Sequence, residues 1–167
     1  MLSFPSLAVG CSCLPVSFNV AMCAADWVSH VEVLSNTTTF SHINYTVKHL
    51  EVFKSPNSTA QLVGKNTPVL TAAQGAACGV TGLGVEKDYL MAGTVDGSGS
   101  LHIHLCQFLP LQFGKPNVKS DTVPEEMKKR LEDWKAEGFD NNESIRRLAF
   151  FFFNTLPTNL ISRRCNY

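Results

Sequence analysis

Two cysteines separated by one residue, Cys11 and Cys13, lie close to the start of the chain. A cysteine sulfur can bind a metal ion, attack an electrophile as a thiolate, or join another cysteine in a disulfide. The sequence contains no C-x-x-C pair, which is the spacing typical of zinc ribbons and thioredoxin-like redox sites. The even number of cysteines favours a disulfide framework instead, although six cysteines allow many pairings and the residues alone leave these open. The six are Cys11, Cys13, Cys23, Cys78, Cys106 and Cys165.

The sequence also contains four N-x-[ST] sequons, the acceptor pattern for N-glycosylation. Disulfides persist in oxidising compartments, and N-glycans are added to secreted proteins. The two features together predict a secreted protein. The candidate acceptors are Asn36, Asn44, Asn57 and Asn142.

No enzymatic signature accompanies the cysteines. The chain lacks an H-E-x-x-H motif, a phosphate-binding loop and a Ser/His/Asp signature. His102 and His104 alternate along a predicted strand and so share a face, which is a spacing that two metal ligands can use. No third ligand is near them, so we interpret them as solvated strand histidines. We therefore predict that the chain is not an enzyme and has no cofactor of its own.

Length and charge exclude further classes of function. A chain of 167 residues is long enough for one domain with a proper core. Its 14 basic and 14 acidic residues cancel, which argues against nucleic-acid binding, since that depends on cationic contacts to phosphate. The longest apolar run, residues 148–153, is far short of the ~20 residues that span a membrane as a helix. Residues 1–10 are apolar with small residues near their end, and we interpret them as a signal-peptide remnant cleaved after Gly10.

Two segments have the pattern of helices. Ser17 is a good N-cap for a short helix over residues 18–26. Thr122 and Glu125 form a capping box for a second helix over residues 125–137. The second helix has acidic residues early and basic residues later, which matches the helix dipole.

Five segments have the composition of β-strands. The last two form a hairpin around the glycine-rich turn at residues 96–99. Alternation along the second strand predicts that Tyr45, Val47 and Phe53 lie on one face. The pattern predicts a mainly β protein with flanking helices, built on a five-stranded OB-like barrel. The predicted strands are residues 27–34, 43–53, 67–73, 88–95 and 100–106.

Several short motifs together resemble a known family. They are C-S-C-L-P at residues 11–15, A-A-C-G-V at 76–80, D-Y-L-M-A-G at 88–93 and L-H-I-H-L-C-Q-F at 101–108, with Cys23 ten residues after Cys13. The combination resembles the N-terminal inhibitory domain of the tissue inhibitors of metalloproteinases, which has a netrin-like version of the OB barrel. The resemblance implies such a domain over residues 11–140, in a single-domain form like that of small invertebrate members. No fold is assigned to the tail at residues 141–167.

The resemblance also implies a disulfide pairing. It pairs Cys11 with Cys78 and Cys13 with Cys106. In the family Cys23 would have a partner just after the second helix, where this sequence has Phe139 instead. Cys165 is the remaining cysteine, so a third pair, Cys23 with Cys165, is expected.

The function implied by the resemblance is inhibition of zinc metalloproteinases of the matrix type. Once Cys11 is the mature N-terminus, its α-amino group and carbonyl oxygen would chelate the catalytic zinc of the protease. Ser12 would enter the specificity pocket beside the zinc, and Leu14 and Pro15 would follow the cleft. The residues implied to bind the protease are Cys11, Ser12, Cys13, Leu14, Pro15, Ala76, Ala77, Cys78 and Gly79.

The implied partner is thus a matrix metalloproteinase or a related zinc endopeptidase, bound one to one in the extracellular space. The alternative that the residues leave open is a non-inhibitory, netrin-like or OB-type extracellular binding module. In that alternative, Cys11 and Cys13 would serve only as framework cysteines.

Overall fold

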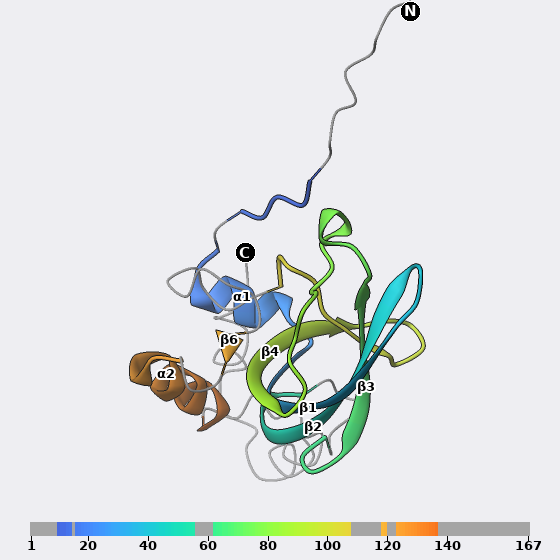
Figure 1. Cartoon of the computed structure of the whole chain (residues 1–167). Helices are drawn as coiled ribbons and strands as arrows, with labels where there is room; N and C mark the ends of the chain where they lie inside the picture. The colour runs from blue at the N-terminus through green and yellow to red at the C-terminus, as the bar shows by residue number, and fades with distance from the viewer. Residues whose placement is uncertain (1–9, 15, 56–61, 108–117, 120–122, 137–167) are drawn as a thin grey trace, which may run out of the picture.

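The computed structural model describes residues 10–14, 16–55, 62–107, 118–119 and 123–136. The described part is mainly β, with a closed barrel and two α-helices outside it (Figure 1). The predicted tail at residues 141–167 lies outside the described residues. The elements are α1 (Phe18–Ala24), β1 (Trp27–Thr38), β2 (His42–Lys54), β3 (Asn66–Ala72), the 3-10 helix η1 (Gly75–Ala77), β4 (Lys87–Val95), β5 (Leu101–His102), β6 (Val118–Lys119) and α2 (Glu125–Ala136).

The barrel closes because β4 pairs with both β5 and β1. The strand order is β1-β2-β3-β5-β4, and the β1–β4 pairing joins the first strand to the last, while β6 adds to β4. Among the described strands, β3–β5 is the parallel pair and the other strand pairs are antiparallel. Closure removes the free edges that an open sheet would expose. The prediction of a mainly β fold with a five-stranded OB-like barrel and flanking helices is confirmed.

Apolar side chains pack in two layers, one inside the barrel and one between the barrel and the helices. The outer layer joins Phe18 of α1 and Trp134 of α2, whose ring centroids are 6.1 Å apart. The inner layer fills the barrel, as a small closed barrel requires. Its buried members are Trp27, Val31, Val33, Ile43, Tyr45, Val47, Leu62, Val69, Val80, Leu83, Tyr89, Met91, Leu101 and Ile103.

Both helices begin where the sequence predicts. The Oγ of Ser17 accepts a hydrogen bond from the backbone N of Val20 at 3.4 Å, so Ser17 is the N-cap of α1. At the other end of α1, Lys54 Nζ donates to Met22 O at 2.7 Å and also to Ala25 O. This cation at the C-terminus of α1 interacts favourably with the negative end of the helix dipole, and its hydrogen bonds hold α1 against β2. Within the described residues, no helix has the length and apolarity needed to cross a bilayer.

The prediction that Phe53 shares a face with Tyr45 and Val47 is wrong. Phe53 packs with the outer layer under the helices, whereas Val52 packs with the barrel interior. The register of β1 against β2 shifts twice over this segment, so that Leu50 and Phe53 have no paired residue in β1. Each β-bulge adds one residue and thereby changes which face the following side chains occupy.

The predicted hairpin around residues 96–99 is confirmed, but its second strand is shorter than expected. β5 ends at His102 rather than at Cys106. Beyond it, Ile103 N still donates to Leu70 O, and the chain then turns towards Cys106. The disulfide of Cys106, described below, lies on this turn and not on a strand.

His49 lies inside the barrel with 0% of its surface exposed. Its Nε2 is 2.6 Å from Thr67 Oγ1, and its ring packs edge-on against Trp27 at 5.8 Å between centroids. Its Nδ1 is buried and has no hydrogen-bond partner among the described residues. This burial lowers the pKa of His49 from 6.5 to about 4. The imidazole is therefore neutral at neutral pH.

Acid should weaken the fold through His49. The unfolded chain binds this proton with a pKa near 6.5 and the folded chain with a pKa of about 4, so unfolding takes up a proton between these values. The stabilisation is complete above pH 6.5 and is lost as the pH falls towards 4. We expect the free energy of unfolding, measured by urea denaturation, to fall by about 3 kcal/mol over this interval.

Two glutamine variants test the assignment. His49→Gln should remove most of this pH dependence, because no buried imidazole is left to protonate. His42→Gln, at the exposed start of β2, should retain it. The assignment fails if His49→Gln keeps the slope of the parent protein between pH 6.5 and 4.

Candidate functional site

Residues 10–14 lie at one end of the barrel, tied there by two disulfides. Cys11 is bonded to Cys78 with a Cα–Cα distance of 5.0 Å. Cys13 is bonded to Cys106 with a Cα–Cα distance of 5.2 Å. In Figure 1 this segment, in blue, and η1, in green, lie at the same end of the molecule. Both pairings that the family resemblance implied are present.

Two other predictions fall partly outside the described residues. Cys23, at the end of α1, is disulfide-bonded. Its predicted partner, Cys165, lies outside the described residues, as does Pro15.

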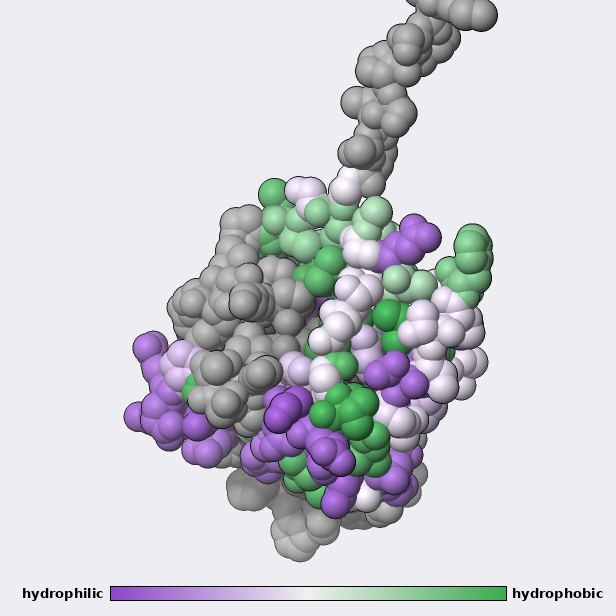
Figure 2. Space-filling view, in the orientation of Figure 1, coloured by the Kyte–Doolittle hydropathy of each residue, from purple (hydrophilic) through white to green (hydrophobic). Residues whose placement is uncertain are grey.

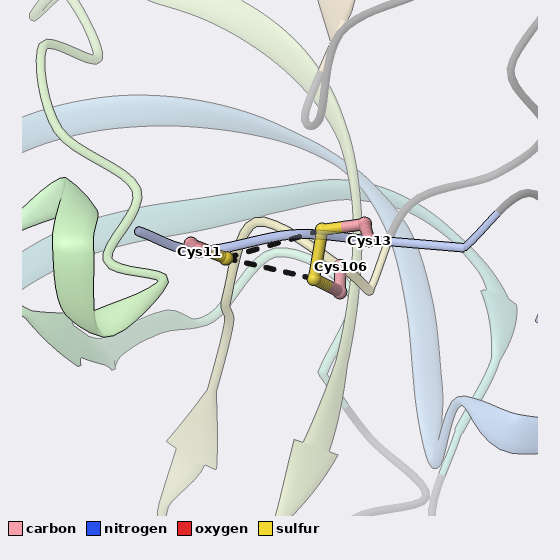
Figure 3. A group of neighbouring side chains, drawn as sticks. All are labelled: Cys11, Cys13 and Cys106. Atoms are coloured by element: carbon pink, nitrogen blue, oxygen red, sulfur yellow. Dashed lines mark hydrogen bonds between the residues drawn. A yellow bond between two sulfur atoms is a disulfide. The ribbon is translucent and has the colours of Figure 1, made fainter. Parts of the chain in front are cut away.

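The sulfurs of the two disulfides are in contact. Cys11 Sγ lies 3.7 Å from Cys106 Sγ and 4.0 Å from Cys13 Sγ, as the dashed lines in Figure 3 mark. Disulfide-bonded sulfurs carry no proton, so these contacts are van der Waals packing and not hydrogen bonds. The sulfurs of Cys11, Cys13 and Cys106 thus form one compact cluster.

The loop that carries Cys78 has a constrained backbone. After η1, Cys78 adopts the left-handed conformation with φ 58°, and its N donates to Gly75 O at 3.0 Å. Gly79 follows, and its N donates to Gln74 O at 3.0 Å. A Cβ on Gly79 would lie 2.0 Å from the carbonyl oxygen of Ala72, so only glycine fits at this position.

The turn that carries Cys106 is hydrogen-bonded to this loop. Leu105 N donates to Cys78 O at 2.8 Å, so the two anchor points of residues 11–13 are linked directly. Cys106 N donates to Nδ1 of His104 at 3.1 Å. Burial lowers the pKa of His104, which favours the neutral imidazole that can accept this bond. His104 therefore shapes the turn.

The paired histidines of the sequence have separate partners. His102 Nε2 is 2.9 Å from Asp96 Oδ2 in the hairpin turn. Hydrogen bonds from Ser98 and His102 hold the pKa of Asp96 well below its usual range. Within the described ranges, the group of three His, Cys, Asp or Glu side chains close enough to share a metal ion is Cys11, Cys13 and Cys106. All three of these sulfurs are in disulfides.

Most of the predicted binding residues are brought together at this end of the barrel. Ser12, Ala76 and Ala77 are exposed, and 86% of the surface of Leu14 is exposed. Gly79 is buried, and its part is to shape the loop. In Figure 2 the upper end of the described surface is mostly green and white, whereas hydrophilic residues in purple gather towards the lower end.

One exposed aromatic residue at the same end was not predicted from the sequence. Phe40, at the tip of the β1–β2 hairpin, has 95% of its surface exposed. The tip is held by Thr39 N donating to His42 O at 2.8 Å, and Ala73 N donates to Ser41 O at 3.1 Å. Ala73 directly precedes the loop of Cys78, so the hairpin tip that carries Phe40 lies beside that loop. The only sequence signal was a large aromatic residue between polar turn residues.

Two of the four sequons lie on the β1–β2 hairpin. Asn36 is exposed, and Asn44 is half-buried with its Oδ1 lacking a hydrogen-bond partner in the described part of the chain. The exposed Asn36 is thus the more accessible acceptor of the two. Asn57 and Asn142 lie outside the described residues.

The chain is similar to named proteins over most of its length. Metalloproteinase inhibitor 2 of the dog, Canis lupus familiaris, is 32% identical over 142 residues, which is 78% of this chain and 58% of the dog protein. The human protein of that name is 33% identical over 135 residues, covering 74% of this chain and 55% of its own length. A putative metalloproteinase inhibitor of Caenorhabditis elegans is 32% identical over 117 residues, 63% of this chain and 72% of its own.

The chain thus spans little more than half the length of the mammalian relatives. The family model that matches, described as tissue inhibitor of metalloproteinase, covers residues 9–114. This match includes the barrel strands β1–β5, Cys11, Cys13 and both of their disulfide partners. It agrees with the interpretation that the chain is not an enzyme. The chain belongs to the family of tissue inhibitors of metalloproteinases.

Proposed function

We propose that this chain inhibits zinc metalloproteinases by placing the backbone nitrogen and carbonyl oxygen of a mature N-terminal Cys11 on the catalytic zinc of the protease. One observation carries the proposal. Two disulfides fix residues 11–13 to the barrel, and the exposed residues of η1 lie next to Cys78, the partner of Cys11. Family membership and relatives named metalloproteinase inhibitors support the same assignment.

A catalytic zinc offers a position that such a ligand can take. It has three protein ligands and a fourth position that holds water or substrate. An α-amino group and the carbonyl oxygen of the same residue can occupy that position as a bidentate ligand. Because the α-amino nitrogen takes the place of the zinc-bound water that would attack the adjacent Cys11–Ser12 peptide bond, that bond is not hydrolysed.

The proposal requires a free amino group on Cys11. In the full sequence, the nitrogen of Cys11 is an amide joined to Gly10, and an amide nitrogen is a poor ligand for zinc. Gly10 is exposed, and a Cβ placed on it would meet nothing within 4 Å. The bond after Gly10 is therefore open to a peptidase, in keeping with cleavage during secretion to the extracellular space.

The disulfides make the chelating residue rigid before binding. Ordering one residue of a flexible terminus costs roughly 1–2 kcal/mol of backbone entropy. Here that cost is met during folding, because Cys11 and Cys13 are both bonded to the barrel. Binding to the zinc then loses little further freedom, which raises the affinity.

The neighbouring residues would set specificity. Ser12, exposed between the two bonded cysteines, would enter the pocket beside the zinc, and Leu14 with Pro15 would follow the cleft. Ala76 and Ala77, which precede Cys78 in the loop, would form a second contact segment with the protease. One inhibitor would bind one protease of the matrix type, because the single segment fills the single active site.

Adding one alanine ahead of Cys11 should abolish inhibition while leaving the fold intact. The added residue converts the amine into an amide and removes the chelate, and it enters open space at the end of the barrel. The measurement is an inhibition constant against a panel of matrix metalloproteinase catalytic domains, using protein whose N-terminus is verified by mass. Protein beginning at Cys11 is the control, and the urea midpoints of the two should agree. Undiminished inhibition by the extended protein would contradict the proposed zinc chelation by Cys11.

We further propose that Phe40 contacts the protease beside the active-site cleft. It is a nearly fully exposed aromatic residue, and buried aromatic anchors carry much of the energy of protein interfaces. Phe40→Ala should weaken inhibition by about 5–30-fold, equivalent to about 1–2 kcal/mol.

The matched control is Val63→Ala. Val63 is also exposed, at 62%, but it pairs with His49 beyond the start of β3, at the end of the barrel opposite the hairpin tip. This variant should inhibit as the parent does. Equal effects of the two substitutions would exclude Phe40 from the interface.

A further inference from the structure

Three of the four sulfurs of the two disulfides at the candidate site lie close enough to react with one another. Cys11 Sγ is nearly equidistant from the two sulfurs of the other bridge, at 3.7 Å from Cys106 and 4.0 Å from Cys13. Figure 3 shows Cys11 facing the Cys13–Cys106 bond. The sulfurs of Cys11, Cys13 and Cys106 form one cluster within 4.8 Å, and Cys78 is not a member of it.

We propose that this cluster is a thiol–disulfide exchange site, in which opening of the Cys11–Cys78 bond by a small thiol leads to opening of the Cys13–Cys106 bond by Cys11. All four residues are half-buried rather than fully buried, so a small external thiol can reach them. The reactant class is a monothiol such as glutathione.

The exchange proceeds in two balanced steps. In the first, the thiolate of the external thiol attacks Cys78 Sγ, forms a mixed disulfide with it and releases Cys11 as a thiolate. In the second, the Cys11 thiolate attacks Cys106 Sγ and forms a Cys11–Cys106 bond. Cys13 leaves as a thiolate and takes up a proton. Attack on Cys13 instead gives a Cys11–Cys13 bond and a thiol on Cys106.

The position of Cys11 explains why the second step can occur only after the first. Its sulfur lies beside the Cys13–Cys106 bond, whereas attack on a disulfide runs in line with the bond that breaks. Once freed from Cys78, the Cys11 side chain can rotate about its own bonds into that line. A nucleophile already held at contact distance has an effective concentration far above that of an external thiol.

The exchange changes the molecule at the candidate site. In either product the residues around Cys11 are no longer bonded to the loop of Cys78. The new bond also leaves Cys13 or Cys106 reduced, so reoxidation of Cys78 alone does not restore the native pairing. A single attack by an external thiol therefore leads to the loss of both native disulfides at the site.

Two serine variants of the full chain test the proposal without a reductant. Cys78→Ser and Cys11→Ser each remove the same native disulfide and leave one thiol, on Cys11 or on Cys78. Each protein is held at pH 8, where an ordinary cysteine has appreciable thiolate, then acid-quenched, alkylated and mapped without reduction. In Cys78→Ser we expect the alkylated thiol on Cys13 or Cys106 in roughly one molecule in ten or more. In Cys11→Ser it should remain on Cys78.

The proposal is overturned if the thiol of Cys78→Ser stays on Cys11, or if it migrates equally in both variants, as general shuffling would produce. Should the variants fail to fold, the parent protein is treated with glutathione and mapped in the same way. Among molecules that carry glutathione on Cys78, alkylation of Cys13 or Cys106 supports the exchange. Alkylation confined to Cys11 in those molecules rules it out.

Discussion

The position of residues 10–14 depends on covalent bonds more than on any other interaction. In the part of the chain that the structure describes, these residues make no backbone–backbone hydrogen bond. What holds them are the bonds to Cys78 and Cys106, which close loops with sequence separations of 67 and 93. Closing loops of this size restricts the unfolded chain and contributes about 4–5 kcal/mol each. The same two bonds therefore stabilise the fold and fix the segment that we assign to zinc.

The barrel topology explains why the two anchor points are neighbours. β3 and β5 are parallel, so both strands end at the same end of the barrel. The chain leaves β3 into the loop of Cys78 and leaves β5 into the turn of Cys106, and Leu105 N joins them by a hydrogen bond to Cys78 O. The β1–β2 hairpin turns at this end too, because His42 at the start of β2 pairs with Ala72 at the end of β3. Three segments far apart in the sequence thus meet at the end of the barrel that holds residues 10–14.

Local sequence signals predicted local structure well. The Ser17 cap and the hairpin around residues 96–99 follow from hydrogen-bonding and turn preferences that act over a few residues. The two disulfides at the candidate site came from the resemblance to a family, because spacing alone cannot choose a pairing. The side-chain faces of β2 beyond Val47 could not be predicted, since two bulges depend on how β1 pairs with it. The burial of His49 and the exposure of Phe40 likewise follow from where the closed barrel places them.

The central claim is that the backbone of Cys11 binds the catalytic zinc of a metalloproteinase. The most direct measurement is a crystal structure of the protein beginning at Cys11 in complex with a matrix metalloproteinase catalytic domain. We expect the α-amino nitrogen and carbonyl oxygen of Cys11 at about 2.0–2.2 Å from the zinc, with no water left on the metal. A zinc that keeps its water, or that is bound by any other segment of this chain, would contradict it.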